Sequence, residues 1–443
     1  MAVNIKKTKI VATLGPATKT KKVFRAMLEA GVNVFRINFS HADYTDVSER
    51  ITMIRELNDE FGYNAAILAD LQGPKLRVGT MKEEVVVSEG DTILFVTGER
   101  FMGTKKRVYM TYDRFPQDAK PGERILLDDG KLIFEVVSTD KKSEVKAKVI
   151  QGGPLKSRKG VNLPNTDISQ PALTEKDIKD AIFAISQNVD WLALSFVRHA
   201  EDLIQLQEII QEHSASKIPI IAKIEKPEAV ENIDKIVAFC DGLMVARGDL
   251  GVEIPAQEVP LIQKQLVLRA KRARIPVIIA TQMMESMITS LTPTRAEVND
   301  VANSVMDGAD AVMLSGETSV GQYPVQVIEK MSSILMSVED SSLIKVPQSP
   351  PHIRTKRYIT KSICYHAANM ANEINAKAIS TLTNTPYIFD DSDYLNLYSY
   401  LKLDTYDDKF HPKKGVDKNP SVMLDNPIAN CNIFNATINP KGR

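Results

Sequence analysis

The chain has 443 residues, 43% of them hydrophobic, and such a length predicts two to four domains, one of which can be a barrel of roughly 250 residues. Its 56 lysines and arginines balance its 56 aspartates and glutamates, which argues against a nucleic-acid partner because such partners require a basic surface. Three scattered cysteines and the lack of a long apolar window favour a protein of the reducing cytoplasm, without disulfides or a membrane segment.

Short apolar runs recur along the chain, and each ends in a polar or glycine-bearing stretch that leads into a helical pattern. Near-continuous apolar strands that alternate with amphipathic helices are typical of a parallel sheet covered on both faces. Eight such runs predict an α/β fold with a closed (β/α)8 barrel, known as a TIM barrel. The runs occupy residues 9–16, 32–40, 65–73, 190–197, 218–228, 241–249, 275–283 and 310–318.

The gap between the third and fourth runs is far too long for one helix. It contains alternating strands joined by Glu-Gly, Asp-Gly and Gly-Gly turns, which indicate β-hairpins. We therefore predict that residues 74–166 form an inserted β-barrel domain, positioned as a lid over the mouth of the main barrel. The main barrel then comprises residues 1–73 and 167–345.

A third domain is expected from residue 346 to residue 443. It begins with a proline-rich linker at residues 346–354, and a helical pattern and a strand-like segment, AKAISTLT, follow. From Pro386 onward the sequence is rich in Asp, Asn, Tyr and Pro without clear periodicity. No fold is assigned to that stretch, so we expect an incomplete or atypical α/β domain.

Polar side chains stand at the ends of the apolar runs. Catalytic residues of (β/α)8 barrels lie at the C-terminal ends of the strands, so the runs predict one shared site. Strand ends can also be polar because they meet water, but seven ends with complementary charges favour a site. The side chains concerned are Arg36, Asn38, Ser40, Asp70, Ser195, Lys223, Glu225, Arg247, Asp249, Thr281, Ser315 and Glu317.

Lys223 and Glu225 are two residues apart on one predicted strand, so both side chains project from the same face. The next run adds Asp249 after Gly248, where the backbone can approach a ligand closely. Two carboxylates beside a lysine suit a hard divalent cation that keeps waters, which favours Mg2+ or Mn2+ over Zn2+. The alternative is a layer of salt bridges inside the barrel.

Arg36, Lys223 and Arg77 supply the positive charge that a phosphoryl group requires, because phosphoryl transfer depends on positioning and charge neutralisation. The sequence contains neither a P-loop nor a Gly-x-Gly-x-x-Gly turn. A bound nucleotide would therefore be held in another way.

Nine motifs in this order resemble pyruvate kinase: RINFSH, GPKLRVG, SRKGVNLP, LSFVR, KIEKPE, ARGDLGVEIP, ATQMMESM, PTRAEVNDVAN and DGADAVMLSGETSVGQYP. The resemblance runs from about residue 5 to about residue 385. It implies a glycolytic phosphotransferase that moves the phosphoryl group of phosphoenolpyruvate to ADP, so that ATP and pyruvate form.

The resemblance also implies roles for individual residues. Glu225 and Asp249 would hold the Mg2+, and Lys223 would stabilise the phosphoryl group during transfer. Gly248 and Thr281, together with Asp249, would hold the carboxylate of the substrate. Thr281 is also a candidate for the proton path to the enolate.

Further residues follow from the same motifs. Arg36 would bind the phosphate, and Ser315 is a second candidate for the proton path. Arg77 and Lys159, with His41 nearby, would bind the nucleotide. Because Arg77 and Lys159 lie in or at the hinges of the inserted domain, closure of that domain would exclude water from the reaction.

A monovalent-cation pocket is the last feature that the family implies. Residues that match Asn38, Ser40, Asp70 and the carbonyl of Leu71 commonly hold K+ in the family, and most members carry Glu at the position of Lys75. The segment DLQGPK resembles the lysine-containing, potassium-independent members, in which an ammonium group supplies the charge that K+ otherwise provides. K+ is therefore not expected to be required, unless Lys75 is simply a solvated lysine after a turn.

Residues 386–443 do not resemble the third domain of the family, so no allosteric effector is inferred, although the family predicts a homo-tetramer. Two other functions compete with this interpretation. One is an Mg2+-dependent lyase or aldolase barrel that acts on the enolate of pyruvate, which needs neither the inserted domain nor a nucleotide. The other is a non-catalytic pseudoenzyme, against which the intact motifs argue.

Overall fold

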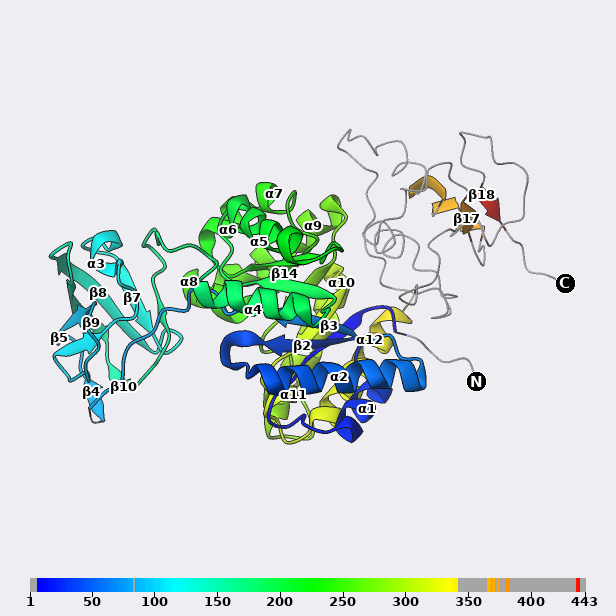
Figure 1. Cartoon of the computed structure of the whole chain (residues 1–443), viewed down its shortest axis with the longest axis horizontal. Helices are drawn as coiled ribbons and strands as arrows, with labels where there is room; N and C mark the ends of the chain where they lie inside the picture. The colour runs from blue at the N-terminus through cyan, green and yellow to red at the C-terminus, as the bar shows by residue number, and fades with distance from the viewer. Residues whose placement is uncertain are drawn as a thin grey trace.

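The computed structural model describes residues 6–82, 84–341, 365–367, 369–370, 373–374, 379–381 and 436–438. Figure 1 shows a barrel surrounded by helices, from one end of which a smaller β domain projects. The predicted linker at residues 346–354 and most of the predicted third domain lie outside the described residues.

Eight parallel strands close into a barrel in the order β1-β16-β15-β14-β13-β12-β3-β2, which confirms the predicted (β/α)8 barrel. Strand β3 pairs directly with β12, with Leu68 opposite Trp191, although the whole insertion separates them in sequence. The insertion therefore leaves the barrel closed. The strands are β1 (Lys9–Thr13), β2 (Val34–Asn38), β3 (Ala66–Asp70), β12 (Trp191–Leu194), β13 (Ile220–Ile224), β14 (Gly242–Ala246), β15 (Val277–Ala280) and β16 (Ala311–Leu314).

Helices cover the outer surface of the barrel and connect successive strands (Figure 1). Several begin with side-chain caps; Thr174, for example, accepts a hydrogen bond from the backbone of Asp177 in a capping box. The longer helices are α1 (Lys21–Ala30), α2 (Tyr44–Phe61), α4 (Glu175–Ser186), α5 (Ala200–His213), α9 (Val259–Ala273), α10 (Arg295–Asp307) and α12 (Pro324–Glu339). The short ones are η1 (Phe39–His41), α6 (Pro227–Glu231), α7 (Ile233–Ile236), α8 (Arg247–Glu253), η2 (Ala256–Glu258), η3 (Glu285–Ile288) and α11 (Gly316–Ser319).

The alternation of side chains along each strand divides the core of the barrel into two layers. On β1, Val11 belongs to the cluster inside the barrel, together with Leu68 of β3 and Met244 of β14. Its neighbours Ile10 and Ala12 belong to the larger cluster between the strands and the helices. Both faces of each strand are thus buried, which explains the near-continuous apolar runs in the sequence.

The inserted segment forms mixed and antiparallel sheets. A six-stranded sheet has the order β11-β7-β8-β9-β5-β6, and β10 pairs with β4 in a separate two-stranded sheet. We expected a β-barrel here, but the six-stranded sheet is not closed by regular strands. Its two edges meet residues 77–78 only through isolated bridges, Arg77 with Gly160 beside β11 and Val78 with Met110 beside β6. The elements are β4 (Val85–Val87), β5 (Thr92–Val96), β6 (Arg107–Tyr109), α3 (Phe115–Asp118), β7 (Arg124–Leu127), β8 (Leu132–Thr139), β9 (Glu144–Gln151), β10 (Gly153–Leu155) and β11 (Val161–Asn162).

The inserted segment has a hydrophobic core of its own. Phe95, Phe115 and Phe134 are fully buried in it and meet edge to face. This cluster is separate from the two clusters of the barrel. A segment with its own core, joined to the rest by two chain crossings, is able to move as a body.

A single buried carboxylate fixes the crossing from the barrel to the insertion and caps the first helix after the insertion. Asp177, at the start of α4, accepts hydrogen bonds from the backbone N–H of Gly73 (3.0 Å) and of Thr174 (3.0 Å). Gly73 lies where the chain leaves the barrel, and its φ of +69° suits glycine. Its backbone also passes close to Phe196, so that an added Cβ would lie 2.7 Å from the ring.

At the far end of the chain, β17 (Ile379–Thr381) lies within the strand-like segment expected from the sequence. It pairs antiparallel with β18 (Ala436–Ile438), which falls in the stretch to which the sequence analysis assigned no fold. Within the described ranges, no helix is both long enough and apolar enough to cross a bilayer.

Replacement of Asp177 by alanine is expected to lower the free energy of unfolding by about 2 kcal/mol, because α4 loses its capping box and the N–H of Gly73 loses its acceptor. Thermal and urea denaturation measure the change. Asp202→Ala is the matched control, since Asp202 also accepts a hydrogen bond from the N-cap N–H of its helix, that of His199 before α5, and makes no bond to Gly73. Equal losses in the two variants would show that the contact with Gly73 contributes nothing.

Candidate active site

The C-terminal ends of β2 and β3 bring an arginine and an aspartate together. The Nε of Arg36 donates to Oδ2 of Asp70 at 2.6 Å, and the two side chains are 11% and 1% exposed. The Nη1 of Arg36 also donates to Oγ1 of Thr13 at 3.0 Å, at the end of β1. The guanidinium plane is thus fixed from two sides before any ligand binds.

Lys223 lies at the centre of the buried cluster. Its Nζ is 3.2 Å from Oδ1 of Asp70, 3.0 Å from Oε1 of Glu225 and 2.7 Å from Oγ of Ser195. The predicted common face of Lys223 and Glu225 is therefore confirmed. Burial acts to lower the pKa of Lys223, but the two carboxylates outweigh it and raise the pKa to about 12. The ammonium group keeps its proton at neutral pH.

Asp70 is ionised for the complementary reason. Burial acts to raise the pKa of its carboxyl, but Lys223 and Arg36 hold the pKa below its ordinary value. Because each buried charge in this cluster has an opposite charge in contact, the cluster is stable only as a unit.

Glu225 and Asp249 are two carboxylates whose negative charges are not fully balanced within the cluster. Burial raises the pKa of Glu225, and repulsion from Asp249 adds to this effect against the attraction of Lys223. The Oε2 of Glu225 accepts from the N–H of Phe196 at 2.8 Å, whereas Asp249 has neither a hydrogen bond nor an ion pair within the described residues. A cation between the two carboxylates would offset both the burial and the repulsion.

The donor set also fits a particular kind of cation. Among the described side chains, no group of three or more His, Cys, Asp or Glu residues could hold a metal. A cation at Glu225 and Asp249 would thus have two protein carboxylates, and water and ligand oxygens would complete its shell. Mg2+ commonly binds proteins in this way.

Gly248 and Thr281 meet at the ends of β14 and β15. The N–H of Gly248 donates to Oγ1 of Thr281 at 2.7 Å, and that hydroxyl donates to the carbonyl of Ala280 at 2.6 Å. Thr281 has a φ of +70°, which is strained for a β-branched residue. Arg247 stabilises this conformation, because its Nη2 donates to the carbonyl of Thr281 while its guanidinium pairs with Asp300.

Ser315 follows β16, and its N–H donates to Oε2 of the buried Glu317 at 2.7 Å. The other oxygen of Glu317 accepts from the N–H of Met284 at 3.1 Å, in the loop that follows β15. Glu317 thus ties together the two loops from which Thr281 and Ser315 come.

The residues expected to form a monovalent-cation pocket lie at the adjoining ends of β2, β3 and β12. Asn38 and Asp70 are register partners, and Oδ1 of Asn38 accepts from the N–H of Ser40 at 3.1 Å. The carbonyl of Leu71 accepts from Oγ of Ser195 at 2.7 Å. Asp70 therefore belongs both to this group and to the Lys223 cluster.

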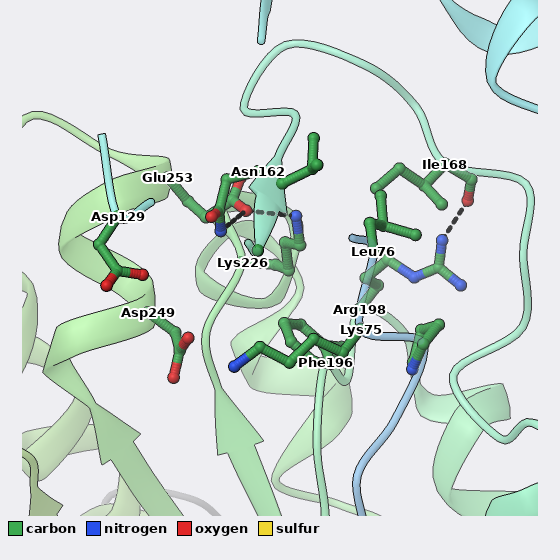
Figure 2. A pocket seen from close by; sticks show the side chains of 13 residues that line it. Lys75, Leu76, Asp129, Asn162, Ile168, Phe196, Arg198, Lys226, Asp249 and Glu253 are labelled. Atoms are coloured by element: carbon green, nitrogen blue, oxygen red, sulfur yellow. Dashed lines mark hydrogen bonds and ion pairs between the residues drawn. The ribbon is translucent and has the colours of Figure 1, made fainter. Parts of the chain in front are cut away.

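A cavity of about 40 Å3 lies between the barrel and the insertion, and Lys75 and Asp249 are among the residues that line it. Figure 2 shows the exposed Lys75 side chain extending across this cavity toward Asp249. Its ammonium group thus faces the carboxylate that has no partner. Two further buried side chains of the cavity, Lys226 and Glu253, form an ion pair of 2.6 Å.

The residues expected at the nucleotide lie together in the insertion. The backbone N–H of Val78, next to Arg77, donates to the carbonyl of Lys159 at 3.0 Å. The Nζ of Lys159 pairs with Asp128 at 2.8 Å. Neither Arg77 nor Lys159 contacts the Lys223 cluster through a hydrogen bond or ion pair in the described part of the chain. His41 ends η1, and its side chain lies outside the described residues.

Sequence reasoning gave no role to two residues that hold the cluster in place. Ser195 was recognised as a polar strand end, but only the structure shows that its hydroxyl links Lys223 to the carbonyl of Leu71. Thr13 was missed, because a threonine at the end of an apolar strand is an ordinary β-forming residue. Its position shortly before the Gly-Pro that ends the first run was the available signal.

Comparisons with known proteins identify the family to which the barrel and its candidate site are similar. The family model described as "Pyruvate kinase, barrel domain" matches residues 5–328. A pyruvate kinase of Corynebacterium efficiens is 47% identical over 380 residues, which cover 86% of this chain and 79% of that protein. A pyruvate kinase of Mycobacterium tuberculosis is 46% identical over 379 residues, which cover 85% of this chain and 79% of that protein.

Structural similarity supports the same family. The crystal structure of a pyruvate kinase from Cryptosporidium parvum superposes with a TM-score of 0.78 at 34% identity and covers 85% of this chain and 78% of that one. A second family model, described as the OMP85 superfamily, matches residues 357–426, which lie almost wholly outside the described residues and support no structural argument. The barrel match and the shared length of these relatives show that the chain belongs to the pyruvate kinase family.

Proposed function

We propose that Lys223 is the residue that neutralises the phosphoryl group in the reaction of this family. The chain is a glycolytic phosphotransferase whose substrates are phosphoenolpyruvate and ADP. The observation that supports the role of Lys223 is its buried, protonated ammonium group between Asp70 and Glu225. A fixed positive charge in a site shielded from water stabilises a transferring phosphoryl group without reorganisation.

Arg36, Gly248 and Thr281 would position phosphoenolpyruvate. Arg36 offers a guanidinium group that Asp70 and Thr13 already orient, which suits the phosphate. The loop of Gly248 and Thr281 would receive the carboxylate, together with Asp249. Because Thr281 and Arg247 fix that loop, little conformational freedom would be lost when the substrate binds.

Glu225 and Asp249 would hold Mg2+, or Mn2+ in its place. When bound, the metal supplies a Lewis acid that neutralises charge on the substrate oxygens. The raised pKa of Glu225 and the unpaired state of Asp249 support this assignment, because both are relieved by a cation.

Thr281 and Ser315 are the proposed members of the proton path to the enolate. Lys223 is poorly suited to give up a proton, because its pKa is raised to about 12. Thr281 has a hydroxyl that both accepts and donates a hydrogen bond, as a relay requires. Ser315 would complete the path from the next strand.

Arg77 and Lys159 would bind the phosphates of the nucleotide from the lid, with His41 at the barrel. Both basic residues belong to a body with its own core, so movement of the lid would bring them toward the Lys223 cluster. Asn38, Ser40, Asp70 and Leu71 would form the monovalent-cation pocket.

Lys75 would replace K+. Its ammonium group extends into the cavity toward Asp249, where a positive charge would assist the binding of anionic substrates (Figure 2). The enzyme would then be active without a monovalent cation.

The larger organisation is proposed as follows. Residues 1–73 and 167–345 form the catalytic barrel, residues 74–166 the lid, and residues 346–443 a third domain. A homo-tetramer in the cytoplasm is proposed from the family, without nucleic-acid or membrane partners.

A coupled assay with phosphoenolpyruvate, ADP and Mg2+ tests the reaction directly. We expect equal amounts of pyruvate and ATP. A lyase or aldolase barrel would form no ATP, and a pseudoenzyme would form neither product. A well-folded sample without pyruvate formation would contradict the proposed roles of all these residues.

Lys223→Met is expected to lower kcat by about 1,000-fold or more, because the transferring phosphoryl group loses its fixed positive charge. The same coupled assay measures kcat, and circular dichroism checks the fold. Lys217→Met is the control, since Lys217 precedes the same strand and forms an exposed pair with Asp241. If the Lys223 variant keeps more than a tenth of the kcat of the parent enzyme, the assignment is wrong.

Lys75→Glu is expected to make the enzyme dependent on K+, with at least about tenfold activation by KCl, because the added carboxylate needs a counter-ion. The parent enzyme should be equally active in KCl and in tetramethylammonium chloride of the same ionic strength. Lys148→Glu reverses the same charge on the exposed face of β9 and should stay independent of K+. Strong K+ activation of the parent enzyme would refute the role of Lys75.

A further inference from the structure

One carboxylate joins the lid to the segments that carry Glu225 and Asp249. The Oε1 atom of Glu253 accepts a hydrogen bond from Nζ of Lys226 at 2.6 Å and another from Nδ2 of Asn162 at 2.8 Å. Figure 2 shows both donors directed at this carboxylate. The Lys226 and Glu253 side chains are 8% and 1% exposed, so their charges interact with little screening by water.

The three residues come from three different parts of the fold. Asn162 ends β11, the last strand of the lid. Lys226 directly follows Glu225 beyond β13, and Glu253 ends α8, one helical turn after Asp249. The ion pair of Lys226 and Glu253 therefore links the two segments that bear the proposed metal ligands.

Asn162 provides the connection to the lid. Among the described residues, its hydrogen bond to Glu253 is the one that joins a lid strand to the barrel. The other hydrogen bonds between lid and barrel lie at the chain crossings, such as Gly73 with Asp177 and Ser169 with Asp118. A movement of the lid would therefore alter the hydrogen bonding of Glu253.

Glu253 has few hydrogen-bond partners that could compensate for such a movement. Its Oε2 atom is buried and has no hydrogen-bond partner in the described part of the chain. Both donors act on one oxygen, so loss of Asn162 leaves the buried carboxylate with Lys226 alone. A buried ionised group with so few donors depends strongly on each of them.

We propose that Glu253 is a positioning residue through which the lid sets the relative positions of Glu225 and Asp249, and hence the affinity of the divalent-cation site. The inference rests on the proposed assignment of the metal to these two carboxylates. Residues that orient metal ligands commonly change metal affinity when they are altered, although they do not touch the ion. By this account Asn162, a lid residue, contributes to metal binding in the barrel.

Titration of the full-length protein with Mn2+, with the free ion followed by electron paramagnetic resonance and no nucleotide present, tests the proposal. Asn162→Ala and Glu253→Gln should each raise the dissociation constant of Mn2+ about tenfold. A role confined to the folding of the lid would leave this constant unchanged. Asn165→Ala is the matched control, because Asn165 is an exposed asparagine close by in sequence and should bind Mn2+ like the parent protein.

The double variant shows whether the two residues act through one contact. In the Glu253→Gln background, Asn162→Ala should change Mn2+ affinity by less than threefold, because the coupling is already broken. Glu253→Gln keeps the size and an acceptor oxygen at this position, so it remains informative if Asn162→Ala fails to fold.

Asp249→Asn separates failure of the inference from failure of the metal assignment. If Asp249→Asn greatly weakens Mn2+ binding while Asn162→Ala and Glu253→Gln leave it within twofold of the parent, the metal assignment stands and the role of Glu253 is refuted. If Asp249→Asn itself leaves Mn2+ binding unchanged, both the assignment and the inference that rests on it fail.

Discussion

A buried ammonium group between two carboxylates is the interaction on which the candidate site depends. Lys223 contacts Asp70 and Glu225, and Asp70 in turn holds Arg36. Ionised groups at such depth are stable only when paired, because the free energy of removing each one from water is large. The pairing preserves the positive charge of Lys223 at neutral pH, and the same charge is available to a phosphoryl group.

The barrel is what makes this pairing possible. Its parallel strands end at one rim, so side chains that are far apart in sequence come within contact distance of one another. Asp70 and Lys223 are separated by the whole insertion, yet β3, β12 and β13 are successive neighbours in the barrel. The insertion leaves at this rim, and Asp177 fixes the outgoing crossing at Gly73, so the lid begins beside the charges that it would enclose.

The barrel and the common face of Lys223 and Glu225 could be predicted from the sequence because they follow from local periodicity, which each strand displays on its own. The role of Ser195 and the contribution of Thr13 could not, since they depend on which strand end lies opposite which. The lid was recognised as β structure from its turns. Its division into two sheets depends on long-range pairing, such as β4 with β10, which short strands hardly signal. Lys75 was singled out by its motif, but its direction toward Asp249 depends on how the chain leaves the barrel at Gly73.

The lid and the barrel have separate hydrophobic cores, so any coupling between them depends on the contacts at their boundary. Bodies with separate cores move relative to one another unless a large apolar interface joins them, and a fully hydrogen-bonded polar network would also make the contact rigid. The contact at Glu253 is of neither kind. One of its oxygens accepts from both Lys226 and Asn162, while the other has no hydrogen-bond partner among the described residues. The hydrogen bonding of this carboxylate would change when the lid moves, because one of its two donors belongs to the lid. A buried carboxylate with incomplete hydrogen bonding is therefore better suited to transmit the position of the lid than a larger apolar interface would be.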